Sequence, residues 1–141
     1  MAYLFDTNAI SETLRKYLLA DYLRWLRSLK REEQYTSAIV MAELYKGAFR
    51  SPNCQTILEK IETRIIPQLT ILPFDRSTAK IYGEIQAQLE QQGKILAHAD
   101  LQIASTAIQH NLELVTGNIQ HFARIKFLSI NHILANARQK S

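Results

Sequence analysis

Met1-Ala2-Tyr3-Leu4-Phe5-Asp6-Thr7-Asn8 joins an unbroken apolar run to three short polar side chains. The run from Ala2 to Phe5 has no alternation of apolar and polar residues, which is typical of a strand buried on both faces of a parallel sheet. Ligands of open parallel α/β sheets bind beyond the carboxyl ends of the strands. Asp6 is therefore placed either to hold a cation or reacting group, or to cap the helix that follows. The tripeptide alone leaves both interpretations open.

Further along the chain, apolar β-rich stretches alternate with helical patterns. Further strands are predicted at 34–37, 69–74, 112–116 and 127–130. Helices are predicted over 18–31, 38–50, 55–66, 75–92, 97–110 and 118–124. Strands that alternate with helices indicate an α/β fold whose central parallel sheet is covered on both faces. We expect one domain over residues 1–141, with a core at about 2–130 and a basic C-terminal tail at 131–141.

Composition favours a globular cytoplasmic protein. Of the 141 residues, 47% are hydrophobic and 21% are charged, which excludes a largely disordered chain. Cys54 is the single cysteine, so one chain can form neither a disulfide framework nor a cysteine zinc site. No signal-peptide pattern and no apolar stretch of membrane-spanning length is present, so we expect no membrane association. A net charge of +4 is mildly favourable for a polyanionic partner.

Asp100 conflicts with the pattern of its own helix. In the helix predicted over 97–110, one continuous apolar arc contains Ala97, Leu101, Ile103, Ala104, Ala107 and Ile108, and Asp100 falls inside it. A favourable dipole interaction at the start of a helix contributes only about 0.3–1 kcal/mol. Burying an unpaired carboxylate costs on the order of several kcal/mol. The dipole interaction therefore cannot explain why a carboxylate lies in this arc. Asp100 therefore needs a cation, a buried partner or a solvent-filled cleft, which favours a functional role.

Glu43 gives a weaker signal. The apolar arc of its predicted helix contains Met41, Leu44, Tyr45, Ala48 and Phe49, and Glu43 lies outside it near Lys46 and Arg50. The periodicity favours a surface ion pair for Glu43. Such a pair stabilises a helix by roughly a few tenths of a kcal/mol. Ile39 and Val40 flank this polar side, so a functional role for Glu43 stays open.

Val115-Thr116-Gly117-Asn118 forms a polar corner after the apolar run that starts at Leu112. Like Asp6, Asn118 is placed where a buried strand ends and a helix begins. It can cap that helix or contact a metal or water as a neutral oxygen ligand. The corner alone does not distinguish these roles.

Taken in order, these places resemble the PIN-domain family, particularly the toxin ribonucleases of the VapC type. The matching stretches are Phe5 to Asn8, Ala42 to Gly47, Gly93 to Ile95 leading to Asp100 to Ala104, and Thr116 to Asn118 followed by His121-Phe122. The resemblance covers Ala2 to about Ile130. It implies a three-layer α/β/α sandwich with an acidic pocket for Mg²⁺ or Mn²⁺.

The resemblance also assigns roles to individual residues. Asp6, Glu43 and Asp100 become the catalytic acids and metal ligands, with Glu43 binding directly or through water. Asn118 stands where many relatives have a fourth acid, and His121 where many have Asp, which implies one well-held metal and a weak second one. The residues implied to contact substrate or to support the metal site are Thr7, Asn8, Thr116, Lys46 and Arg50. Arg76 and Arg124 are further candidates for phosphate contacts, each with ordinary solvated surface as the alternative.

The implied activity is metal-dependent hydrolysis of RNA phosphodiesters by an activated water, in the toxin of a type II toxin–antitoxin pair. The implied partners are RNA, a cognate antitoxin and a second copy of the chain. One rival is an aspartyl-phosphate phosphatase, which resembles Asp-x-Asp, but here Asn8 occupies the second position. The other rival is a non-catalytic RNA-binding or interaction module, which would not need Asp100 in an apolar arc.

Overall fold

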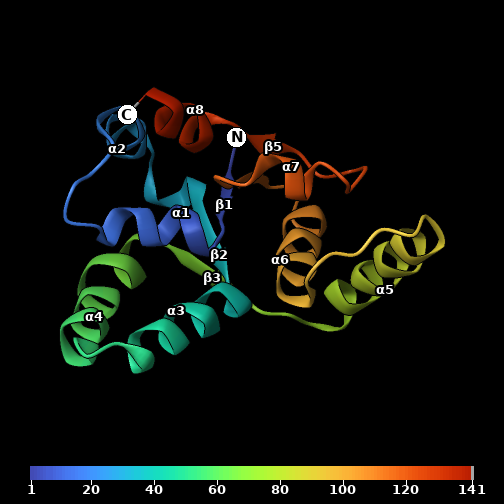
Figure 1. Ribbon diagram of the computed structural model, residues 1–141, viewed down its shortest axis with the longest axis horizontal. Coiled ribbons are helices and arrows are strands. Elements are labelled where there is room, and N and C mark those ends of the chain that lie inside the picture. The colour runs from blue at the N-terminus through green and yellow to red at the C-terminus, as the bar shows by residue number, and fades with distance from the viewer. Residues whose placement is uncertain (141) are drawn as a thin grey trace.

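Five parallel strands form the centre of the molecule in the order β3-β2-β1-β4-β5. The computed structural model describes residues 1–140. Figure 1 shows α1 to α4 on the left and lower sides of the sheet and α5 to α7 on the right. The strands are β1 (Tyr3–Phe5), β2 (Gln34–Ser37), β3 (Thr70–Leu72), β4 (Glu113–Val115) and β5 (Ile130–Asn131). The predicted α/β fold with a parallel sheet is confirmed.

Strand β1 is the central strand, as its unbroken apolar run predicts. Leu4 pairs in register with Tyr35 of β2 on one side and Leu114 of β4 on the other, and its side chain is fully buried. The Thr36 hydroxyl donates a hydrogen bond to the Phe5 carbonyl at 2.8 Å. These contacts hold the carboxyl ends of three neighbouring strands together, where ligands bind in such sheets.

Two of the longer helices begin at residues whose side chains cap them. The Ser37 hydroxyl accepts a hydrogen bond from the Val40 N–H, and the Asp75 carboxylate accepts one from the Thr78 N–H. Gly93 follows α5 with a φ of +69°, a conformation that favours glycine. The α-helices are α1 (Thr7–Ser11), α2 (Ala20–Ser28), α3 (Ala38–Arg50), α4 (Cys54–Lys60), α5 (Arg76–Gln91), α6 (His98–Gln109), α7 (Ile119–Phe122) and α8 (Ile133–Lys140).

Short turns complete these elements and account for most boundary differences. A 3₁₀ turn follows α1 at Glu12–Leu14, and a π-helical turn at Ile61–Ile65 continues α4, so the helix predicted over 55–66 is split. Two more 3₁₀ turns lie at Arg31–Glu33 and Ile66–Gln68. The last strand was predicted at 127–130 and lies at Ile130–Asn131, still at the edge of the sheet. Within residues 1–140, no helix combines the length and apolar character that a bilayer crossing requires.

The segment expected to be a basic tail contains helix α8, which packs against α2 (Figure 1). Its Leu134 and Ala137 lie three residues apart on one face and are buried, with 0% and 5% exposure. Arg138 and Lys140 give this segment a basic composition, which conceals so short an apolar face in the sequence. Helix α8 therefore brings the end of the chain back to the first turn after β1.

Candidate active site at the carboxyl ends of the strands

Asp6 follows β1 directly and is the N-cap of α1. Its Oδ1 accepts a hydrogen bond from the Ala9 N–H at 2.8 Å, and the side chain is only 4% exposed. Burial raises the pKa of Asp6 from its ordinary value of 3.8 to about 6. The Asp100 carboxylate also raises this pKa, whereas a hydrogen bond from the Thr116 side chain, the Ala9 N–H and the positive charge of Arg138 lower it. Asp6 thus caps a helix and also interacts with a second carboxylate.

Asp100 lies in the first turn of α6 and has the partner that its apolar surroundings require. Its Oδ2 is 2.8 Å from Nε2 of His121 on α7. The Asp100 side chain is 32% exposed, so it is not fully desolvated. A polar partner together with partial solvent access explains how a carboxylate is accommodated in the apolar arc.

Glu43 faces α1. The Thr7 hydroxyl donates a hydrogen bond to Glu43 Oε1, which joins the first residue of α1 to the second turn of α3. Periodicity favoured a surface pair with Lys46 or Arg50, yet both of those residues are exposed while Glu43 is half-buried. The partner of Glu43 comes from another helix, so the pattern of α3 alone could not identify it.

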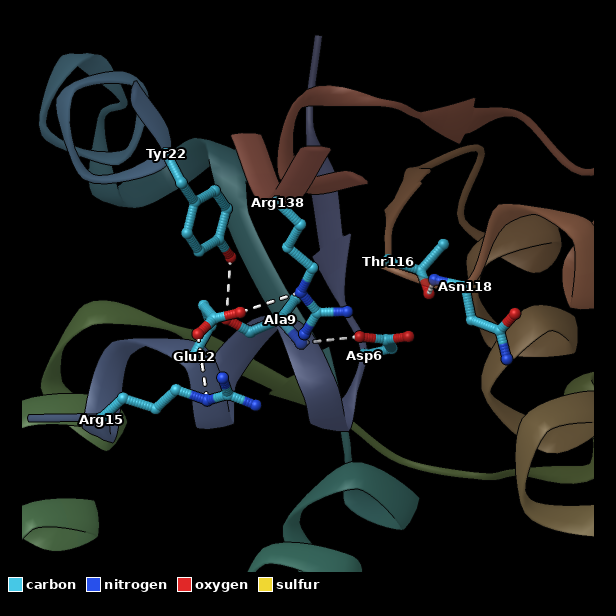
Figure 2. Close-up of polar contacts among 8 residues, drawn as sticks. All are labelled: Asp6, Ala9, Glu12, Arg15, Tyr22, Thr116, Asn118 and Arg138. Atoms are coloured by element: carbon cyan, nitrogen blue, oxygen red, sulfur yellow. Dashed lines mark hydrogen bonds and ion pairs between the residues drawn. The ribbon is translucent and has the colours of Figure 1, made fainter. Parts of the chain in front are cut away.

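The corner after β4 is tied to Asp6 through Thr116. Thr116 is fully buried, and its hydroxyl accepts a hydrogen bond from the Asn118 N–H at 3.0 Å while the side chain also hydrogen-bonds to Asp6. Figure 2 shows Thr116 and Asn118 on one side of Asp6. Among residues 1–140, α7 has no side-chain cap from Asn118. The helix-cap alternative for Asn118 therefore lacks the hydrogen bond that would define it.

The remaining candidates are exposed on the surface. Asn8 is exposed in the first turn of α1, and Arg76 is exposed at the start of α5. Arg124 Nη1 donates a hydrogen bond to the Ile95 carbonyl at 2.6 Å, which joins the end of α7 to the loop before α6. These residues remain predictions as RNA contacts.

The carboxylates of this site suit a hard divalent cation, but they do not form a complete metal site by themselves. In the part of the chain that the structure describes, no three His, Cys, Asp or Glu side chains are grouped closely enough to hold a metal ion. Asp6 and Asp100 nevertheless interact electrostatically, and both offer hard oxygen ligands. Mg²⁺ commonly binds through one or two carboxylates and completes its shell with waters and substrate phosphate. The acidic pair matches that mode of binding.

Two contacts of the site could not be predicted from the sequence. The resemblance places His121 where many relatives have Asp, and in the structure His121 is the partner of Asp100. Arg138 of α8 donates from Nε to Glu12 Oε1 at 2.9 Å and points toward the region between Glu12 and Asp6 (Figure 2). Because 126 residues separate Arg138 from Glu12, only the tertiary structure reveals their contact.

The raised pKa of Asp6 predicts an unusual pH dependence in the metal-free protein. Between pH 3.8 and about 6 the folded chain binds more protons at Asp6 than the unfolded chain, so stability falls as pH rises through this window. The full difference corresponds to about 3 kcal/mol. With EDTA present, Asp6→Asn should raise the melting temperature at pH 8 by roughly several degrees. The increase at pH 4 should be much smaller.

Asn retains the capping ability of Asp6, so the comparison isolates the charge. Asp21→Asn is the matched control, because Asp21 is partly exposed on α2 and pairs with Arg24 and Lys140. Melting curves of the three proteins at both pH values provide the measurement. Equal melting temperatures for the native chain and Asp6→Asn at pH 8 would contradict the electrostatic account of this site.

Comparison with known proteins gives a consistent result. A family model described as PIN domain matches residues 3–128. Toxin FitB of Neisseria gonorrhoeae is 40% identical over 124 residues, covering 84% of this chain and 89% of that protein. Ribonuclease VapC2 of Rickettsia felis is 34% identical over 132 residues, covering 94% of this chain and 98% of that protein.

Solved structures show the same similarity. The FitAcB structure from Neisseria gonorrhoeae superposes with a TM-score of 0.84 at 37% identity, covering 92% of this chain and 96% of that one. The structure of VapBC2 from Rickettsia felis bound to a DNA fragment from their promoter gives a TM-score of 0.85 at 34% identity. It covers 93% of this chain and 98% of that one.

Proposed function

The chain belongs to the PIN-domain family, and on that premise we propose that it is a metal-dependent endoribonuclease, the toxin of a type II toxin–antitoxin pair. One observation carries the proposal: Asp6, buried at the end of the central strand, interacts electrostatically with Asp100. The names of the relatives, toxin and ribonuclease, support the same activity over nearly the whole chain.

In the proposed reaction, Asp6 and Asp100 hold Mg²⁺ or Mn²⁺, and Glu43 binds directly or through water. When bound, the metal supplies a water of lowered pKa and stabilises charge on the scissile phosphate. The protein orients its acids: Thr116 and the Ala9 N–H hold Asp6, and His121 holds Asp100.

Glu43 has a separate task in this scheme. The Thr7 hydroxyl donates to Oε1 and so fixes the direction of the carboxylate in the second turn of α3. A carboxylate held in this way can accept a proton from a water, either directly or through a second water. Thr7 thus acts as a positioning residue, and Glu43 is the third acid of the proposed site.

The proposed partners are RNA as substrate, a cognate antitoxin as inhibitor and a second copy of this chain. The titles of the solved relatives describe FitAcB and a VapBC2 assembly, which supports a protein partner here. The rival phosphatase chemistry loses support because Asn8, which is not a carboxylate, is exposed on α1. A non-catalytic RNA-binding module would not need a metal for its activity.

Expression of the chain in a bacterial host tests the toxin proposal. The native chain should arrest growth, and co-expression of the small protein encoded next to it should restore growth. Asp100→Asn, produced to the same level, is the control and should not arrest growth. Unimpaired growth with folded native protein would contradict the toxin role, and cleavage mapping on total cellular RNA would then test the nuclease activity separately.

A further inference from the structure

Glu12 is a buried carboxylate that the proposed reaction does not use. It lies in the turn after α1, its side chain is 3% exposed, and each of its oxygens faces one arginine. Oε1 accepts from Arg138 Nε at 2.9 Å, and Oε2 pairs with Arg15 Nε at 3.1 Å. Buried carboxylates require such pairing. Glu12 therefore fixes the guanidinium of Arg138, which comes from the last helix of the chain.

The two arginines lie in different surroundings. The Arg15 side chain is 65% exposed, whereas that of Arg138 is 33% exposed. Figure 2 shows the Arg15 guanidinium below Glu12, farther from Asp6, and the Arg138 guanidinium between Glu12 and Asp6. The positive charge of Arg138 also acts on the Asp6 carboxylate. Arg138 is thus the member of the pair that faces the candidate active site.

Gly117 makes room for this placement. A Cβ atom at position 117 would lie 1.9 Å from Arg138 Nη1 and 2.6 Å from Cζ, far inside van der Waals contact. The guanidinium consequently packs against the backbone of the corner whose Thr116 hydrogen-bonds to Asp6. Two independent contacts, with Glu12 and with Gly117, hold the charge of Arg138 beside Asp6.

We propose that Arg138 is an RNA-contacting residue of the active site, whose guanidinium binds the phosphate backbone next to Asp6. This inference rests on the proposed ribonuclease function. The acidic pair of Asp6 and Asp100 repels a polyanionic strand, so a fixed cation beside Asp6 offsets that repulsion. The planar guanidinium suits phosphate oxygens, and phosphate contacts position a strand without reading its sequence.

Equilibrium binding of RNA tests the proposal. The probe is a fluorescein-labelled single-stranded RNA in Mg²⁺ buffer, bound to the cleavage-deficient Asp100→Asn protein and followed by anisotropy over a range of KCl concentrations. Adding Arg138→Met should weaken binding about tenfold and reduce the slope of log affinity against log salt by about 0.7. Arg138→Lys, which keeps the charge, should retain the slope. Arg15→Met is the matched control and should change RNA affinity by less than about twofold.

Gly117→Ala provides a second variant with unchanged net charge. The added methyl group displaces the guanidinium, so RNA affinity should again fall about tenfold, with Arg138 still present. This variant decides the question if Arg138→Met does not fold. RNA affinity equal to that of the parent in folded Gly117→Ala would overturn the proposal.

Three further outcomes are decisive. Equal losses of RNA affinity in Arg15→Met and Arg138→Met would show that Arg138 acts only by pairing with Glu12, and would overturn the proposal. Undiminished affinity in Arg138→Met, combined with RNA cleavage by the native chain, would overturn this inference and leave the ribonuclease function intact. A native chain that neither binds nor cleaves RNA would instead contradict the proposed function itself.

Discussion

Asp100→Asn is expected to lower the rate of RNA cleavage by roughly a thousandfold, with a similar loss for Asp6→Asn. Each substitution replaces a carboxylate that we propose as a metal ligand with a neutral amide of nearly the same shape. The fold should persist, because Asn can still cap α1 at position 6 and can still hydrogen-bond to His121 at position 100. Cleavage of a labelled RNA with saturating Mg²⁺ measures the effect.

Circular dichroism and calorimetry with Mn²⁺ separate chemistry from folding. Both variants should keep the native spectrum while losing measurable Mn²⁺ binding. Asp21→Asn again serves as control, since it removes a carboxylate of the same kind from a partly exposed position on α2. Full activity in either folded active-site variant would contradict the assignment of that residue as a ligand.

Asn118→Asp is expected to lower the Mg²⁺ concentration for half-maximal cleavage by about tenfold, because a new negative charge beside a partly desolvated site attracts a second cation. The corner bearing Asn118 is tied to Asp6 through Thr116, so the new carboxylate is added next to the acidic pair. Since the amide does not cap α7, the substitution removes no side-chain cap. The second Mn²⁺ binding event should strengthen more than the first.

Titration of cleavage against Mg²⁺, together with Mn²⁺ calorimetry, provides the measurement. Thr116→Ser is a conservative control at the same corner, because it keeps the hydroxyl that accepts from the Asn118 N–H. Unchanged metal dependence and unchanged melting temperature in Asn118→Asp would show that this side chain points away from the metal site.

From the sequence, Asp100 could be proposed as a site residue because it interrupts an apolar helical arc. Asp6 could be placed at the end of an apolar strand, but its neighbours alone left a capping role equally open. The same reasoning located the parallel sheet, because β1 carries no polar alternation and has strands on both sides.

The remaining features depend on contacts between distant segments. Glu43 is defined by Thr7 on another helix, 36 residues away, and periodicity along α3 favoured a surface ion pair instead. The contact of Arg138 with Glu12 needs α8 to return to the start of the chain. The apolar face of that helix is too short to predict its full length from the sequence. Local sequence patterns predict which residues are buried. Contacts between distant segments can be predicted only when the topology of the fold is known.

The most direct test of the metal-site account is the anomalous difference map of a crystal grown with Mn²⁺. The account predicts a Mn²⁺ peak with carboxylate oxygens of both Asp6 and Asp100 at roughly 2.1 Å, and loss of that peak in Asp100→Asn crystals. A cleavage-competent preparation whose crystals bind Mn²⁺ only elsewhere, or not at all, would contradict it.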